Sequence, residues 1–92
     1  MYNLPAKEKE VVSFYLEKII KTMNPQKVYL FGSKAKGNFT STSDTDFAVI
    51  TDGLFDTTEI YGAADIIDFS RASETLKKEI LDFGILLYER KK

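Results

Sequence analysis

The sequence predicts a small α+β domain, a mixed β-sheet with helices packed mainly on one face. Two segments carry apolar residues at helical spacing, and four short runs of β-branched, aromatic and other apolar residues are typical of strands. The helices are expected over residues 5–23 and 73–82, and the strands over residues 27–31, 47–50, 64–69 and 85–88. A chain of 92 residues can bury one modest core, so residues 1–92 are expected to form a single domain.

The composition limits the available chemistry. Cysteine and histidine are absent, which excludes disulfides, thiolate or imidazole metal sites and Ser-His triads, and leaves carboxylates as the acid, base and metal-binding groups. Thirteen basic and fourteen acidic residues give a formal charge of −1, so nucleic acid would bind only at a local site. The sequence has neither an apolar run of roughly 18 residues nor a secretory signal, so we expect a cytoplasmic protein without membrane contact.

The first helix is predicted from apolar side chains three and four positions apart, which would form one face packed on the sheet. These side chains are Val12, Tyr15, Leu16, Ile19, Ile20 and Met23. Asn24-Pro25 ends the helix because a residue before proline avoids the helical conformation. The charges between the apolar positions have both signs, so the helix is expected to cover the sheet and not a membrane.

A turn at Gly32-Ser33 follows the first strand. Glycine lets the backbone approach a ligand closely, and Ser33 could cap a short helical segment over residues 33–36 whose N–H groups point at an anion. Lys34 and Lys36 add positive charge near this turn. The turn therefore suits a phosphate group, although by itself it is equally typical of an ordinary strand-to-helix connection.

Two carboxylates open the second strand. Asp44 and Asp46 are one residue apart, so on a strand both would point to the same face. Like charges this close disfavour each other's ionised form unless a cation offsets them, and hard cations such as Mg²⁺ prefer carboxylate oxygen. The pair indicates a divalent-cation site, with solvated residues at a strand start as the alternative.

Two rival motifs are excluded. Gly32 and Gly37 have the glycine spacing of a P-loop, but Asn38-Phe39 replaces the Lys-Ser/Thr pair of that motif. An EF-hand loop is excluded because the two acids run directly into an apolar strand, without the glycine and glutamate that such a loop needs.

The connection between the second and third strands is weakly helical. Asp56 and Glu59 have the spacing of a variant capping box, so one or two helical turns are expected over residues 56–62.

The third strand contributes a further acid. Asp65 and Asp68 are three residues apart and would point to opposite faces of a strand, so at most one of them can join Asp44 and Asp46. Spacing alone does not decide which of the two joins the pair, and the default expectation for Asp68 is a surface or capping residue.

The C-terminal part completes the predicted fold. Ser73 is expected to cap the second helix, and Gly84 is expected to end it. Residues 89–92 are expected to form a frayed, exposed tail.

The spacing of these residues resembles that of a known family. Gly32-Ser33, ten further residues and then Asp44-x-Asp46 look like the signature of the polymerase-β-like nucleotidyltransferase superfamily, and the flanking residues resemble its smallest members, the minimal nucleotidyltransferases. The resemblance covers about residues 28–88 and implies the nucleotidyltransferase α+β core. The chain departs from the family between the second and third strands, where most members have a longer helical connection.

The resemblance also implies roles for particular residues. Asp65 matches the family's third metal-binding aspartate, here within Ala-Asp-Ile-Ile-Asp. The implied catalytic residues, which would also bind two Mg²⁺ ions, are Asp44, Asp46 and Asp65. The implied residues for binding the donor nucleotide, ATP, are Gly32, Ser33 and Lys36.

Many minimal nucleotidyltransferases are encoded as antitoxins beside HEPN-domain toxins. The resemblance therefore implies transfer of AMP to a hydroxyl group of a partner macromolecule, with a tyrosine of a HEPN ribonuclease toxin as the acceptor. One alternative is a non-catalytic binding module that neutralises its partner by occlusion. Another is an unrelated Mg²⁺-binding or structural domain.

Overall fold

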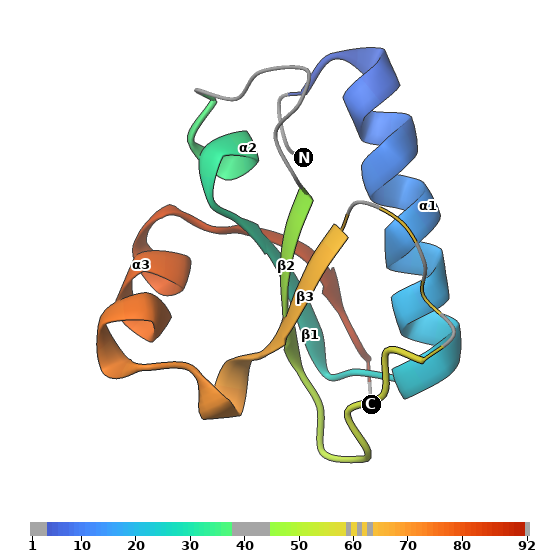
Figure 1. The fold of residues 1–92 in the computed structure, drawn as a ribbon, viewed down its shortest axis with the longest axis vertical. Coiled ribbons are helices and arrows are strands. Elements are labelled where there is room, and N and C mark those ends of the chain that lie inside the picture. The colour runs from blue at the N-terminus through green and yellow to red at the C-terminus, as the bar shows by residue number, and fades with distance from the viewer. Residues whose placement is uncertain (1–3, 38–44, 59, 61, 63, 92) are drawn as a thin grey trace.

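Four strands form one mixed sheet in the computed structural model, which describes residues 4–37, 45–58, 60, 62 and 64–91. The strands are β1 (Lys27–Phe31), β2 (Thr45–Ile50), β3 (Ala64–Asp68) and β4 (Ile85–Glu89), and their order across the sheet is β3-β2-β1-β4 (Figure 1). Strand β1 pairs antiparallel with β2 and β4, whereas β2 pairs parallel with β3. The predicted α+β class and mixed sheet are confirmed.

The helices are α1 (Ala6–Met23), α2 (Ser33–Lys36), the 3₁₀ helix η1 (Phe69–Arg71) and α3 (Glu74–Phe83). Three of these helices lie close to their predicted ranges, whereas η1 is not predicted and includes Phe69, which the sequence assigns to the third strand. Helices α1 and α3 lie on opposite sides of the sheet, and α2 lies near the end of the sheet at which β2 and β3 begin (Figure 1). Within the described ranges, none of the helices combines the length and apolar character needed to cross a membrane.

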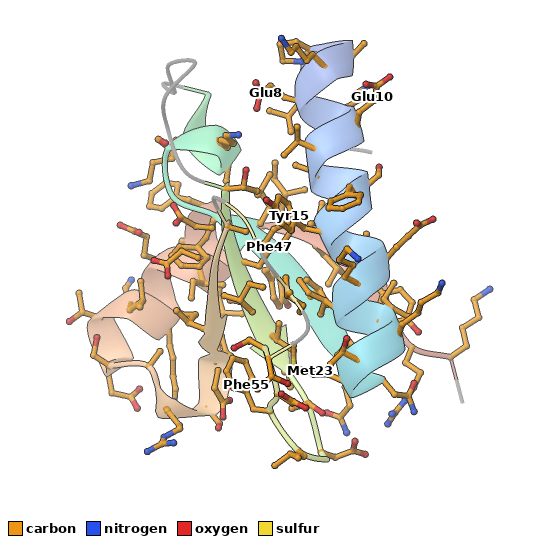
Figure 2. The ribbon with its side chains drawn as sticks, turned by 45° about the vertical axis from the view of Figure 1, so that its right-hand side comes forward. Glu8, Glu10, Tyr15, Met23, Phe47 and Phe55 are labelled. Carbon is orange, nitrogen blue, oxygen red and sulfur yellow. The ribbon has the colours of Figure 1, made fainter. Side chains whose placement is uncertain are left out.

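The main apolar core lies between α1 and one face of the sheet, as the helical spacing predicts. Helix α1 contributes buried side chains at Val12, Tyr15, Ile19 and Met23, and the sheet contributes Val28, Leu30, Phe47 and Val49. The rings of Tyr15 and Phe47 have centroids 6.2 Å apart, and Figure 2 shows both between α1 and the sheet. Each fully buried aliphatic or aromatic side chain contributes about 1.5–3 kcal/mol, so this contact is the principal source of stability.

The opposite face of the sheet has a smaller cover. Ile80 of α3 is fully buried, and the ring of Phe69 in η1 stacks on Tyr29 of β1 with centroids 6.4 Å apart. Tyr29 alternates with Val28 and Leu30 along β1, so it points away from α1. Packing is therefore heaviest on the α1 face, with α3 covering part of the other.

The expected helical turns at residues 56–62 are wrong, because no helix is present in the described residues of that connection. The Asp56 carboxylate accepts hydrogen bonds from the N–H of Thr58 at 3.0 Å and from its hydroxyl at 2.7 Å. Such a local bond offers the backbone a turn in place of a helix. The same bonds, the backbone one first, hold the pKa of Asp56 below its ordinary value. Glu59 lies outside the described residues.

Three predicted caps and helix ends are confirmed. Asn24 ends α1 in the left-handed conformation with φ 45°, and the Ser73 hydroxyl accepts a hydrogen bond from the N–H of Leu76 at 3.2 Å. Asp68, expected at the surface or in a cap, caps η1 by accepting from the N–H of Ser70 at 3.1 Å. Polar side chains thus fix both ends of the segment that joins β3 to α3.

The expected frayed tail is wrong for Arg90, which is bonded to two other segments. Its guanidinium donates to the Asn24 carbonyl at 2.9 Å and to the Asp52 carboxylate at 3.0 Å, and its backbone N–H donates to the Gln26 carbonyl at 2.8 Å. The hydrogen bond from Arg90 holds the pKa of Asp52 below its ordinary value. Sequence spacing could not reveal these contacts, because the partners are 38 and 66 residues away.

Asp52→Asn is expected to lower stability more at neutral pH than in acid. Because the folded-state pKa of Asp52 is depressed, its contribution is present above the unfolded value near 3.8 and is lost as pH falls through the folded pKa. Urea unfolding at pH 7 and at pH near 3 measures the difference in the free energy of unfolding between wild type and variant. Glu89→Gln, which removes an exposed ion pair of 3.7 Å with Lys27, is the control and should change stability less at pH 7. Equal effects of Asp52→Asn at both pH values would contradict this account.

Candidate active site

Two acids occupy neighbouring positions on β2 and β3. Asp46 pairs with Asp65 in the parallel register, and paired residues of adjacent strands point to the same face of a sheet. Strands lie about 4.8 Å apart, so the two carboxylates start from adjacent backbone positions. Asp46 is partly buried and Asp65 is exposed on the edge strand.

The direction of both acids follows from the apolar core. On β2, Thr45, Phe47 and Val49 are buried toward α1, so Asp46 must point to the opposite face. On β3, Ile66 pairs with Phe47 and packs against the same core, which turns Asp65 to the face of Asp46. A shift of one residue in either strand would bury a carboxylate under α1, so the core strongly specifies the register.

The turn at Gly32 lies against the Asp46 carboxylate. Gly32 has φ 78° and ψ −154°, a conformation that other residues rarely adopt, and it precedes Ser33 at the start of α2. A Cβ atom at residue 32 would overlap the Asp46 Oδ2 atom. The structure therefore brings together Gly32, Asp46 and Asp65, three residues that the sequence predicts to share a site.

Asp44, the other predicted acid, lies outside the described residues, and its place beside Asp46 stays a prediction. Within the described ranges, no group of three or more Asp, Glu, His or Cys side chains is arranged to hold a metal ion. The adjacent carboxylates of Asp46 and Asp65 are of the ligand type that Mg²⁺ prefers. Their chemistry fits a hard divalent cation.

Lys36 contacts α3 in this structure. Its ammonium forms an ion pair of 3.2 Å with Glu79, and it lies 5.5 Å from the centre of the Phe83 ring. Both charged side chains are more than a third exposed, so the pair contributes little to stability and can exchange for another anion. Binding of a nucleotide by Lys36 stays a prediction.

Lys34, grouped with Lys36 in the sequence as added positive charge, has a different environment. Its side chain is 6% exposed, and its ammonium donates to Glu8 Oε1 at 2.5 Å and to Thr45 Oγ1 at 2.9 Å. Sequence reasoning missed this cluster because Glu8 is 26 residues away and has the appearance of one of many surface charges on α1. Thr45 is 1% exposed on β2, so its hydroxyl needs a polar partner, which Lys34 supplies.

The fold and the paired carboxylates define a small domain of the nucleotidyltransferase-like α+β class. The family model described as "Polymerase beta, Nucleotidyltransferase" matches residues 15–92, and the chain belongs to this family. The resemblance inferred from the Gly-Ser and Asp-x-Asp spacing is thus confirmed for the family. A search of curated proteins gave no match.

Solved structures share the fold. A chain of a toxin–antitoxin complex crystallised with AMP-PNP has a TM-score of 0.67 and 23% identity, covering 85% of this chain and 73% of the other. A putative nucleotidyltransferase from Sulfolobus solfataricus has a TM-score of 0.60 and 23% identity, covering 90% and 81%. A mutant of the toxin–antitoxin complex MntA-HpeT has a TM-score of 0.62 and 25% identity, covering 97% and 76%.

Gly32→Ala is expected to destabilise the protein more than Gly37→Ala. Both glycines have positive φ, but an alanine Cβ meets the Asp46 carboxylate at residue 32 and nothing within 4 Å at residue 37. Strain and overpacking of about 1–3 kcal/mol each give a loss of about 2–6 kcal/mol for Gly32→Ala, against about 1–2 kcal/mol for Gly37→Ala. Denaturant unfolding measures both values. Equal losses of unfolding free energy in the two variants would show that the turn is not in close contact with the Asp46 carboxylate.

Proposed function

We propose that the protein is a Mg²⁺-dependent nucleotidyltransferase that transfers AMP from ATP to a hydroxyl group of a partner macromolecule. The observation that carries the proposal is the register pairing of Asp46 with Asp65 beside the Gly32 turn, in a chain of the polymerase β nucleotidyltransferase family. The toxin–antitoxin neighbour crystallised with AMP-PNP supports ATP as the donor.

The acids of the candidate site would bind the metal ions, and the residues of the turn and α2 would contact the donor phosphates. Asp44, Asp46 and Asp65 would hold two Mg²⁺ ions, and these ions, when bound, would stabilise negative charge on the attacking and leaving oxygens. Gly32 has no side chain to keep the backbone of the turn away from the donor phosphates, and the Asp46 carboxylate occupies the place where a Cβ would lie. Ser33 and Lys36 would complete the contacts to the phosphates with a hydroxyl and an ammonium.

Asp65 has the position suited to the acceptor. It is exposed and lies on β3, an edge strand, so a hydroxyl group of another molecule can reach it without displacing part of the fold. In a sequence without histidine, a carboxylate is the side chain available to take the proton of that hydroxyl as it attacks the α-phosphorus. Pyrophosphate would leave from the opposite side.

The partner we propose is a HEPN-domain toxin in the cytoplasm, with a tyrosine hydroxyl as the acceptor. Two of the solved structures with this fold are described as toxin–antitoxin complexes, which supports an antitoxin role. Adenylylation of the toxin would then be the means of neutralising it.

A second candidate function is neutralisation by occlusion without catalysis. Three exposed apolar side chains favour it, Leu81 and Phe83 of α3 and Leu86 of β4, which are 59%, 60% and 44% exposed. Large apolar side chains left exposed on a surface can contribute to contacts with another protein.

Asp46→Asn and Asp65→Asn are each expected to reduce transfer at least about a hundredfold, because a neutral amide holds a divalent cation poorly and cannot take a proton. The assay is incorporation of label from α-labelled ATP into the purified HEPN partner with Mg²⁺. Asp68→Asn is the matched control, since this residue is on the same strand, points to the other face and caps η1, a role that asparagine can fill.

The outcomes separate the candidate functions. Label on the partner with wild type and Asp68→Asn, but not with Asp46→Asn, supports the transferase. Neutralisation of the partner by wild type and Asp46→Asn alike, without label, supports occlusion. Absence of both label and ATP binding in wild type would refute the transferase proposal.

A further inference from the structure

A buried cluster joins three segments behind the candidate site. The Lys34 ammonium of α2 donates to Glu8 in the first turns of α1 and to the hydroxyl of Thr45, the first residue of β2. Figure 2 shows Glu8 on the side of α1 that is turned toward α2, whereas Glu10 points away from it. The side chains of Lys34, Thr45 and Glu8 are 6%, 1% and 19% exposed.

Burial of the Lys34 ammonium has a desolvation cost, and the fold could avoid this cost by leaving the side chain at the surface. Removing a charge from water costs several kcal/mol unless partners offset it, and a buried ion pair is often no more stabilising than apolar residues of the same size. The neighbouring Lys36 shows that the same short helix can keep a lysine at the surface. A role other than stability therefore needs to be considered for Lys34.

The cluster links the two halves of the candidate site. Lys34 follows Gly32-Ser33 directly, and Thr45 precedes Asp46 directly. Because Thr45 points toward α1 and Asp46 points to the opposite face, the bond to Thr45 holds the strand from behind the carboxylate. Lys34 thus connects the turn and the carboxylate-bearing strand through side chains, in addition to the backbone pairing of Phe31 with Asp46.

We propose that Lys34 is a positioning residue for nucleotidyl transfer, which fixes the separation between the Gly32-Ser33 turn and the Asp46 strand, with Glu8 of α1 as its counter-ion. This inference rests on the function proposed above. Under this proposal, α1 packs on the core and also helps to hold the candidate site in place through Glu8. A misplacement of about 1 Å can cost on the order of a hundredfold in rate, so loss of this link should affect the reaction more than it affects folding.

The test compares Lys34→Met, Thr45→Val and Glu8→Gln with wild type. Lys34→Met keeps the apolar stem, and Thr45→Val keeps the side-chain shape, so each removes hydrogen bonds with little change in volume. The matched controls are Glu10→Gln, an exposed acid of the same helix, and Lys78→Met, whose ion pair of 3.4 Å with Asp82 lies on the surface of α3. Lys34→Arg tests rescue by a side chain that retains the charge.

Two readouts are taken at a temperature where circular dichroism shows each variant to be folded. The first is kcat and KM for ATP in the labelling assay, and the second is Mn²⁺ affinity by electron paramagnetic resonance, which needs no turnover. Lys34→Met is expected to lower kcat per folded molecule at least about tenfold and to weaken Mn²⁺ binding, with smaller losses for Thr45→Val and Glu8→Gln and partial recovery in Lys34→Arg. The two control variants should match wild type.

Each outcome decides the proposal. Unchanged kcat and unchanged Mn²⁺ affinity in folded Lys34→Met would overturn it and leave a purely structural cluster. If Lys34→Met does not fold, the kcat and Mn²⁺ affinity of Thr45→Val are compared with wild type instead, and unchanged values overturn the proposal. If wild type transfers no label but binds Mn²⁺ in a manner that depends on Lys34, the proposed function fails and Lys34 positions a cation site alone. If wild type neither transfers label nor binds Mn²⁺, both proposals fail.

Discussion

The packing of α1 on one face of the sheet is the constraint on which the rest of the structure depends. Phe47 of β2 and Ile66 of β3 are neighbours in the sheet, and both pack in the core beneath α1. Since side chains alternate along a strand, burial of these two residues leaves Asp46 and Asp65 together on the other face. The hydrophobic effect, which has no directional preference of its own, here sets the direction of the acidic side chains.

The core sets the direction of the acidic side chains, and two further contacts hold the strand that carries Asp46. Gly32 brings the backbone of the turn against the Asp46 carboxylate, where any larger residue would collide with it. Lys34 binds Thr45 from the core side and is neutralised by Glu8 of α1. The candidate site is thus held from both faces of β2, by a close backbone approach on one side and by a buried charge on the other.

Local patterns in the sequence predict most of this arrangement. Apolar periodicity gives the helices and strands to within a few residues, and the period of two along the third strand allows only one of Asp65 and Asp68 to share a face with Asp46. The family resemblance selects Asp65, and the strand register places it opposite Asp46. Contacts between distant segments could not be predicted. The ion pair of Lys34 with Glu8 and the bonds of Arg90 to Asn24 and Asp52 depend on how the finished elements meet. The loop near Asp56 was misjudged because an acid that can start a helix can equally close a turn by bonding Thr58.

The central claim is that a divalent cation binds between the carboxylates of β2 and β3, opposite the glycine turn. Titration of the isotopically labelled protein with substoichiometric Mn²⁺, followed through paramagnetic broadening of backbone amide signals, tests it most directly. The account predicts that the signals of Gly32, Asp46 and Asp65 broaden first and recover when Mg²⁺ is added in excess. Broadening that begins at the exposed acids of α3, Glu74 and Asp82, with those three signals unaffected, would contradict it.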